Sequence, residues 1–217
     1  MRVDRFLRAE DLAAIEAAVR EAETASGGEI VPYVVDASDA YPGAAWTAAA
    51  LGALALPLVA AAVAWRLDPW GGWPLWMTLP PFAGAALGWL AAALIEPLRR
   101  ALVPPAVIER RVEQRAAAAF LAEEVFLTRD RTGVLVFVSL FEHRVVVLAD
   151  AGIHQRVPAG AWEAVVAETV AGLRAGRPGE AIAAAVRQVG CLLVDHCVPR
   201  RPDDSDELAD RVRREER

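Results

Sequence analysis

Two long runs of uncharged, mostly apolar residues constrain this chain more than any other feature. Residues 45–65 and 75–95 contain no acidic or basic side chain. As a helix, each run of ~21 residues would be about 31 Å long, close to the roughly 30 Å hydrocarbon core of a bilayer. A helix satisfies its own backbone hydrogen bonds in lipid. We therefore expect a transmembrane helical hairpin over residues 44–97, in preference to a hairpin buried in a soluble core.

The arginines predict how this hairpin is oriented. Only Arg66 lies between the two runs, whereas a cluster of arginines follows the second run. Positive residues concentrate on the cytoplasmic side of a membrane. The sequence therefore predicts two spans in the inner (plasma) membrane, with residues 1–43 and 98–217 in the cytoplasm. The clustered arginines are Arg99, Arg100, Arg110, Arg111 and Arg115.

Tryptophans predict where the hairpin meets the membrane surface, and glycines predict where its helices pack. Trp65, Trp70, Trp73 and Trp76 gather at the connector, as side chains of an interfacial aromatic belt do. Small residues let membrane helices approach closely. Gly84 and Gly88 form a G-x-x-x-G step, and Gly52 lies on the other run. We expect these glycines to pack the hairpin on itself; the alternative is a homodimer through Gly84 and Gly88.

Composition excludes several functions. The net charge is −6, and no basic stripe is interleaved with aromatic residues, which argues against nucleic-acid binding. Two cysteines, Cys191 and Cys197, are too few for a disulfide framework and suit a reducing compartment. The chain also lacks Cys-x₅-Arg, P-loop, G-x-S-x-G and H-E-x-x-H motifs. No catalytic residue is assigned.

The remaining segments alternate between helical and strand patterns. They predict an α/β fold: a small mixed sheet with helices on both faces, interrupted by the hairpin. Residues 1–43 and 98–198 form this domain, and residues 199–217 a charged, mostly solvated tail. Pro32 lacks a backbone donor, so we expect an irregularity in its strand. The predicted helices are 9–25, 104–126, 159–175 and 179–196, and the strands are 29–35, 134–141 and 145–149.

Three stretches resemble the TPM domain family. They are "GGEIVPYVVDAS" from Gly27, "FLTRDRTGVLVFVSLFEHRVVVLADAGI" from Phe126 and "AGLRAGRPGEAIAAAVRQVG" from Ala171. Family members commonly read D-N-G-V-L before the second strand, where this chain has D-R-T-G-V-L from Asp130. A common V-G-Y-G-L after the hairpin of strands is matched by A-D-A-G-I from Ala149.

The resemblance implies properties that residue patterns alone do not. Members of the family include a thylakoid-lumen acid phosphatase linked to photosystem II repair and many bacterial membrane proteins. It implies an α/β sandwich, calcium binding in several members and phosphatase activity in a few. It also implies roles in the assembly or repair of membrane complexes. We therefore expect a membrane-anchored accessory factor that contacts lipid and other membrane proteins, with a weak metal-dependent acid phosphatase as the alternative.

Acidic residues at the ends of the predicted strands are candidate metal ligands. Asp36 follows the first strand, Asp130 precedes the second and Asp150 ends the third. Carboxylate oxygens are suitable ligands for Ca²⁺, which we expect in preference to Mg²⁺. The alternative is that each aspartate only stabilises a turn or a helix cap. Arg131 and Arg144 are candidate phosphate-binding residues. Pairing of these arginines with acids such as Glu142 is the ordinary alternative.

Overall fold

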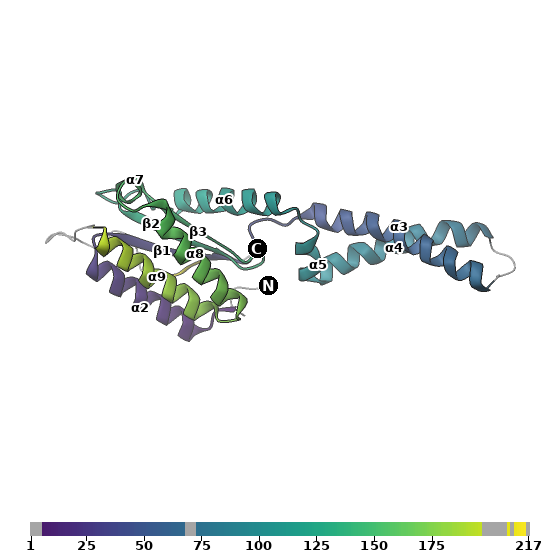
Figure 1. Cartoon of the computed structure of the whole chain (residues 1–217), viewed down its shortest axis with the longest axis horizontal. Helices are drawn as coiled ribbons and strands as arrows, with labels where there is room; N and C mark the ends of the chain where they lie inside the picture. Colours follow the sequence, from purple (N-terminus) through teal and green to yellow (C-terminus); the bar gives the residue numbers. More distant parts are fainter. Residues whose placement is uncertain (1–5, 68–72, 197–207, 209–210, 216–217) are drawn as a thin grey trace. The chain divides into compact units, whose positions relative to one another are not determined.

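The chain forms two compact units, one of residues 1–38 and 109–217 and the other of residues 39–108. The computed structural model describes residues 6–67, 73–196, 208 and 211–215 (Figure 1). We call the units the α/β unit and the hairpin unit. The strands are β1 (Glu29–Val35), β2 (Gly133–Ser139), β3 (Arg144–Ala149) and β4 (Arg213–Glu215). The helices are α2 (Ala9–Ala25), α3 (Pro42–Leu67), α4 (Trp73–Leu94), α5 (Glu96–Ala101), α6 (Pro105–Ala122), α7 (Ala151–His154), α8 (Ala159–Arg174) and α9 (Pro178–Asp195).

A four-stranded mixed sheet in the order β3-β2-β1-β4 forms the centre of the α/β unit. β1 and β2 are parallel, with Glu29 opposite Gly133 and Val35 opposite Ser139. β3 is antiparallel to β2, and β4 is parallel to β1. The predicted mixed sheet is confirmed. It gains one strand that the sequence analysis did not foresee.

Helices cover both faces of this sheet. Every residue of β1 and β2 is buried, which is the pattern of strands covered on both sides. Ile30 and Val34 share one core cluster with residues of α2, α8 and α9. Figure 1 shows α6 on the opposite face from α2 and α9. On the alternate positions of the two strands, Tyr33 stacks on Phe137 with ring centroids 5.8 Å apart.

The unforeseen strand β4 comes from the charged end of the chain. It pairs with the last three residues of β1. The guanidinium of Arg213 lies 2.6 Å from the carboxylate of Glu123, and Val212 beside it is buried. Residues 212–215 were predicted to belong to a solvated tail, but they pack against the sheet. Residues 199–207, 209–210 and 216–217 lie outside the described residues. Backbone pairing, which side-chain composition does not reveal, accounts for the difference.

Pro32 fits into β1, opposite Val136 of β2, without the loss of a ladder hydrogen bond. Alternate residues of a parallel strand direct their backbone groups to opposite neighbours. The N–H of Glu29 donates to the carbonyl of Thr132 on the β2 side, whereas the N–H of Ile30 donates to the Glu23 carboxylate. Pro32 has the direction of Ile30, so its missing donor faces the other edge. β4 does not reach Pro32 on that edge, so no ladder bond is lost.

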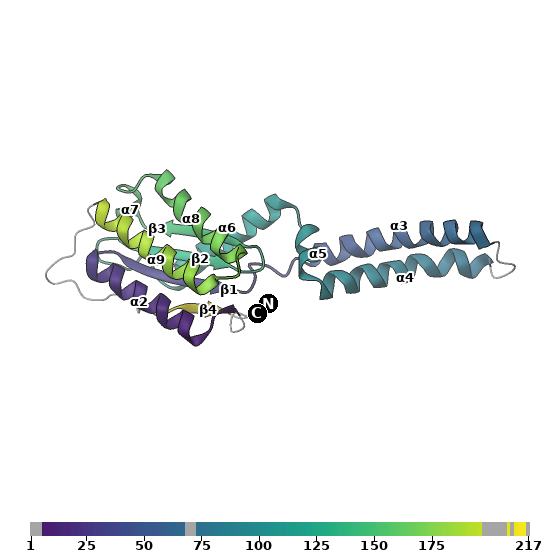
Figure 2. The same ribbon diagram turned by 60° about the horizontal axis from the view of Figure 1, so that its bottom comes forward.

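In the hairpin unit, α3 and α4 run antiparallel and side by side (Figure 2). The two helices approach closely at glycines: a Cβ added to Gly84 would meet the Gly52 carbonyl oxygen at 2.1 Å. One added to Gly88 would meet the Ala48 oxygen at the same distance. Packing of the hairpin on itself, as predicted, uses both glycines. The homodimer through Gly84 and Gly88 stays a prediction that these contacts do not favour.

Small side chains line the inside of the hairpin, and large apolar side chains point outward. Ala44, Ala48 and Ala92 are buried. Trp46, Leu58 and Phe82, by contrast, have about three quarters of their surface exposed (70%, 71% and 77%). Within the described residues, α3 is the one helix long and apolar enough to cross a membrane, over Pro42–Arg66. The described apolar part of α4, Thr78–Leu94, is shorter.

The predicted aromatic belt at the connector falls largely outside what the structure describes. Residues 68–72, which include Trp70, lie outside the described residues, and so do the side chains of Trp73 and Trp76. Trp65 is described, and 88% of its surface is exposed. The belt therefore stays a prediction, to which Trp65 adds one exposed aromatic side chain at the end of α3.

Replacing Gly84 by alanine is expected to loosen the hairpin. The new methyl group would meet backbone atoms, and such overpacking typically costs about 1–3 kcal/mol. SDS titration of the full chain in mild detergent, followed by tryptophan fluorescence, measures this loss, because every tryptophan except Trp162 lies in the hairpin region. Gly43→Ala is the matched control, since no atom lies within 4 Å of its Cβ position. Equal stability of the two variants would contradict the packing argument.

Candidate functional site at the two ends of the sheet

The parallel pairing of β1 and β2 gives the sheet two distinct ends. We call the end with Glu29 and Gly133 the amino end, and the end with Val35 and Ser139 the carboxyl end. A strand rises about 3.3 Å per residue, so the two ends are roughly 20 Å apart. The predicted site residues divide between these two ends.

At the amino end, Arg131 and Asp150 form a two-pronged ion pair. The Nη2 of Arg131 donates to the Oδ1 of Asp150 at 2.9 Å, and Nε lies 2.7 Å from Oδ2. The backbone N–H of Ala151 donates to the same Oδ1 at 2.7 Å, so Asp150 is also the N-cap of α7. Asp150 is 5% exposed, whereas just over half of the Arg131 side chain (54%) faces solvent.

The backbone around this pair is closely packed. Arg131 has a left-handed conformation with φ of 58°, and its carbonyl accepts the N–H of Gly152 at 3.0 Å. A Cβ at position 152 would lie 2.4 Å from the carbonyl oxygen of Asp130, so only glycine fits there. Asp130 itself is exposed in the same loop. Gly152, two residues after Asp150 and within α7, is thus what lets the loop approach this helix.

At the carboxyl end, a buried hydrogen-bonded cluster connects the segment after β1 to the turn after β2. The backbone N–H of Ser38 donates to Oε1 of Glu142 at 2.8 Å. The hydroxyl of Ser139 donates to Oε2 of the same carboxylate and lies 2.9 Å from the hydroxyl of Ser38. Asp36 is buried beside this cluster, and its carbonyl accepts the N–H of Phe141. In open α/β sheets, ligands bind beyond this end of parallel strands.

The three predicted metal ligands do not come together. Asp130 and Asp150 lie at the amino end, and Asp36 lies at the carboxyl end with Arg144, which is exposed and opposite Ser139. The physical reason is strand direction: a residue that follows β1 lies beside one that follows β2, and away from one that precedes β2. Arg131 and Arg144 are separated for the same reason. The five residues therefore do not form a single phosphate or metal site.

The residues present do not fit the calcium site that the family resemblance implies. Across the described ranges, no group of three His, Cys, Asp or Glu side chains is arranged to hold a metal ion. Calcium requires six to eight oxygen ligands. At Asp150, Oδ1 already accepts a hydrogen bond from Nη2 of Arg131, and Oδ2 lies 2.7 Å from Nε in ion-pair contact. These residues, as arranged here, do not make a metal site.

Sequence reasoning overlooked the role of Ser139 and Glu142. It considered Glu142 only as a partner for an arginine, whereas its carboxylate accepts hydrogen bonds from Ser38 and Ser139. The available signal was the polar Ser139 at the end of an otherwise apolar strand, at the same level as the end of β1. Comparing the residues that follow β1 with those that end β2 would have indicated this polar cluster.

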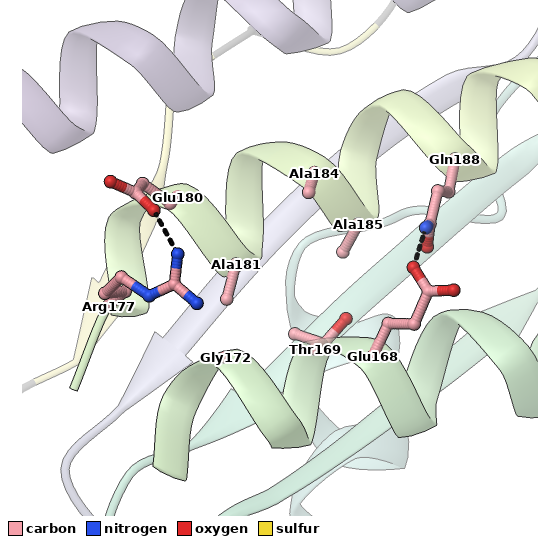
Figure 3. A pocket seen from close by; sticks show the side chains of 9 residues that line it. All are labelled: Glu168, Thr169, Gly172, Arg177, Glu180, Ala181, Ala184, Ala185 and Gln188. Carbon is pink, nitrogen blue, oxygen red and sulfur yellow. Dashed lines mark hydrogen bonds and ion pairs between the residues drawn. The ribbon is translucent and has the colours of Figure 1, made fainter. Parts of the chain in front are cut away.

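A hollow of about 200 Å³ lies between α8 and α9 (Figure 3). Its floor consists of small residues, among them Gly172 and Ala181. Figure 3 shows Arg177 paired with Glu180 at one end and Gln188 with Glu168 at the other. Arg177 and Glu180 pair at the start of α9, and Gln188 pairs with Glu168 across from α9 to α8, so these four polar groups already bind one another. The hollow is a gap left by small side chains where two helices pack.

Comparison with known proteins now connects this arrangement to a family. Residues 102–191 match the model of the TPM domain. The match runs from the segment before α6 into α9 and contains both Arg131 and Asp150. It also contains Ser139 and Glu142, whereas Asp36 and Ser38 lie outside it. No curated protein matches the chain in sequence.

A solved structure shares the fold. The chain is similar to the NMR structure of the BA42 protein from the psychrophilic bacterium Bizionia argentinensis, with a TM-score of 0.60. The two chains are 18% identical, and the alignment covers 99% of each. At this identity the likeness shows the fold alone. The chain is thus similar to the TPM domain over residues 102–191 and similar in fold to BA42.

Truncating Glu142 to alanine is expected to destabilise the α/β unit. The partly buried N–H of Ser38 and the buried hydroxyl of Ser139 would lose their acceptor, at a cost of about 1–3 kcal/mol for a buried group left unsatisfied. Thermal unfolding of the full chain in detergent, followed by circular dichroism, measures this. Glu163→Ala, at an exposed position of α8, is the control and should unfold like the wild type. An unchanged Tm for Glu142→Ala would mean that the cluster does not hold the carboxyl end together.

Proposed function

We propose that this chain is a membrane-anchored protein whose TPM-like α/β unit lies at the cytoplasmic face and acts as an accessory or assembly factor for membrane complexes. The hairpin unit is the anchor in this proposal, with α3 and α4 as its two spans. The α/β unit supplies a surface for other membrane proteins. Lipid and membrane proteins are therefore its expected partners.

The observation that carries this proposal is the pairing of β1 with β2 on either side of the hairpin. β1 precedes α3 and β2 follows α4, yet the two strands form one parallel ladder. If α3 crosses a bilayer, β1 and β2 can share a sheet only when the chain crosses back. α4 is the apolar helix available for that return, although its described part is shorter than α3. The ladder thus supports two spans over one.

The side chains of the hairpin unit support a lipid environment. A soluble protein buries its large apolar side chains, but here Leu54 is 69% and Leu94 is 73% exposed. Membrane helices pack through small residues because lipid removes the advantage of burying large ones. The exposed Trp46 and Trp65 lie 19 residues apart on α3, about 28 Å along a helix, which matches the hydrocarbon thickness.

The α/β unit supports an interaction role in preference to the phosphatase alternative. The predicted phosphate-binding residues, Arg131 and Arg144, lie at opposite ends of the sheet. Arg131 pairs with Asp150, and the buried Glu142 is engaged by two serines. No arrangement among these residues places a nucleophile, an acid and a phosphate-binding group together. The phosphatase reading therefore keeps only the family resemblance in its favour.

Replacing the hairpin by a short Gly/Ser linker is expected to release the chain from the membrane. The wild type should stay in the pellet after alkaline carbonate extraction, because two apolar spans are not displaced by high pH. The variant should be recovered in the supernatant with a cooperative thermal transition, since β1 and β2 can still pair. It should also no longer migrate with membrane complexes on native gels. Extraction of the wild type by carbonate would rule out an integral anchor.

Cysteine labelling tests the orientation. Cys191 is exposed, and both cysteines follow the hairpin in the chain. A membrane-impermeant maleimide should label them in inverted vesicles and leave them unlabelled in intact cells. In a chain with Cys191→Ser and Cys197→Ser, an added Asp68→Cys in the connector should show the opposite pattern. Labelling of Cys191 in intact cells would put the α/β unit outside.

A further inference from the structure

We propose that the guanidinium of Arg131 takes the place of a divalent cation at Asp150, so that the amino end of the sheet is held together without a metal. This inference concerns the α/β unit alone and does not depend on the membrane anchor. It also differs from the family resemblance, which implies calcium binding. In this proposal, the guanidinium of Arg131 supplies at Asp150 the positive charge that a bound calcium ion would otherwise supply.

The geometry of the pair carries the inference. Both oxygens of the Asp150 carboxylate face Arg131, at 2.9 Å from Nη2 and 2.7 Å from Nε. Oδ1 also accepts the N–H of Ala151 at 2.7 Å. Side-by-side approach of a guanidinium to a carboxylate is the strongest arrangement that arginine makes. A cation at Asp150 would approach a carboxylate that is already paired with a guanidinium and that already caps α7 through Oδ1.

Arg131 is also held in position by several contacts. Its backbone N–H donates to Thr128, and its carbonyl accepts from Gly152, which fixes the left-handed turn at φ of 58°. The guanidinium carbon lies 5.8 Å from the centre of the Phe126 ring, within the range of a cation–π contact. A side chain that is already ordered loses little conformational freedom on pairing. The loop therefore holds the positive charge of the Arg131 guanidinium in a fixed position.

The local sequence agrees with this role. Where the family commonly has D-N-G-V-L, this chain has D-R-T-G-V-L, so an arginine directly follows Asp130. The adjoining Thr132 anchors the loop further, since its hydroxyl donates to the carbonyl of Gly27 and its N–H donates to Thr128. The departure from the family pattern thus introduces the positive charge at the residue that reaches Asp150.

Thermal unfolding of the full chain in detergent, with EDTA, with Ca²⁺ and with Mg²⁺, tests the proposal. The wild-type Tm is expected to be the same in all three. Arg131→Gln should lower the Tm because it leaves the buried Asp150 carboxylate without its counter-charge. The double variant Arg131→Gln/Asp150→Asn should recover part of the loss, since the buried charge is gone. Arg144→Gln, an exposed arginine at the carboxyl end, is the control and should leave the Tm unchanged.

Two results would overturn the proposal. One is a rise in the wild-type Tm with Ca²⁺ that Asp150→Asn abolishes; an ion at a hundred times its dissociation constant would raise the Tm by roughly 5–10 °C. The other is an Arg131→Gln variant as stable as the wild type. A calcium shift that Asp150→Asn retains would come from a site elsewhere and would support a cation-free Asp150.

Discussion

The parallel ladder between β1 and β2 is the interaction on which the rest of this structure depends. It joins Glu29–Val35 to Gly133–Ser139, two segments separated in the chain by the whole hairpin unit. Both strands are apolar on both faces, so forming the ladder also creates the surfaces that α2, α9 and α6 cover. Because β1 and β2 are neighbours in the sheet, the chain that leaves β1 through α3 must come back through α4 before it forms β2. Formation of the sheet therefore requires the two long helices to form a hairpin.

The edge of β1 that faces away from β2 is only partly paired with a strand, and side chains satisfy other backbone groups near it. The Glu23 carboxylate accepts the N–H of Ile30, and the Glu29 carboxylate accepts the N–H of Leu208. Pro32 needs no acceptor there, and the short strand β4 pairs only with the last three residues of β1. Proline, acidic side chains and a short edge strand all protect a sheet from pairing with other chains. A proline that argued against a central strand is thus part of how the edge is protected.

The candidate site was only partly predictable. That Asp150 lies near the Asp130–Arg131 loop follows from β3 being antiparallel to β2, and the structure brings Arg131 and Asp150 into contact. Asp36 lies away from that loop, because it follows the end of β1 beside the end of β2, whereas the loop precedes the start of β2. Ser139 and Glu142 were missed as partners. Which acid engages which donor depends on loop conformations, such as the left-handed Arg131, that no spacing rule encodes.

By itself the sequence determined the element types, the mixed α/β class and the position of the hairpin, because these follow from local periodicity and from long runs without charge. The tertiary structure alone decided the fourth strand, the division of the acidic residues between two ends of the sheet and the pairing of Arg131 with Asp150. Those features depend on strand direction, on backbone pairing of charged segments and on the close approach permitted by Gly152. Each is a relation between residues far apart in the chain, and a local pattern carries no information about it.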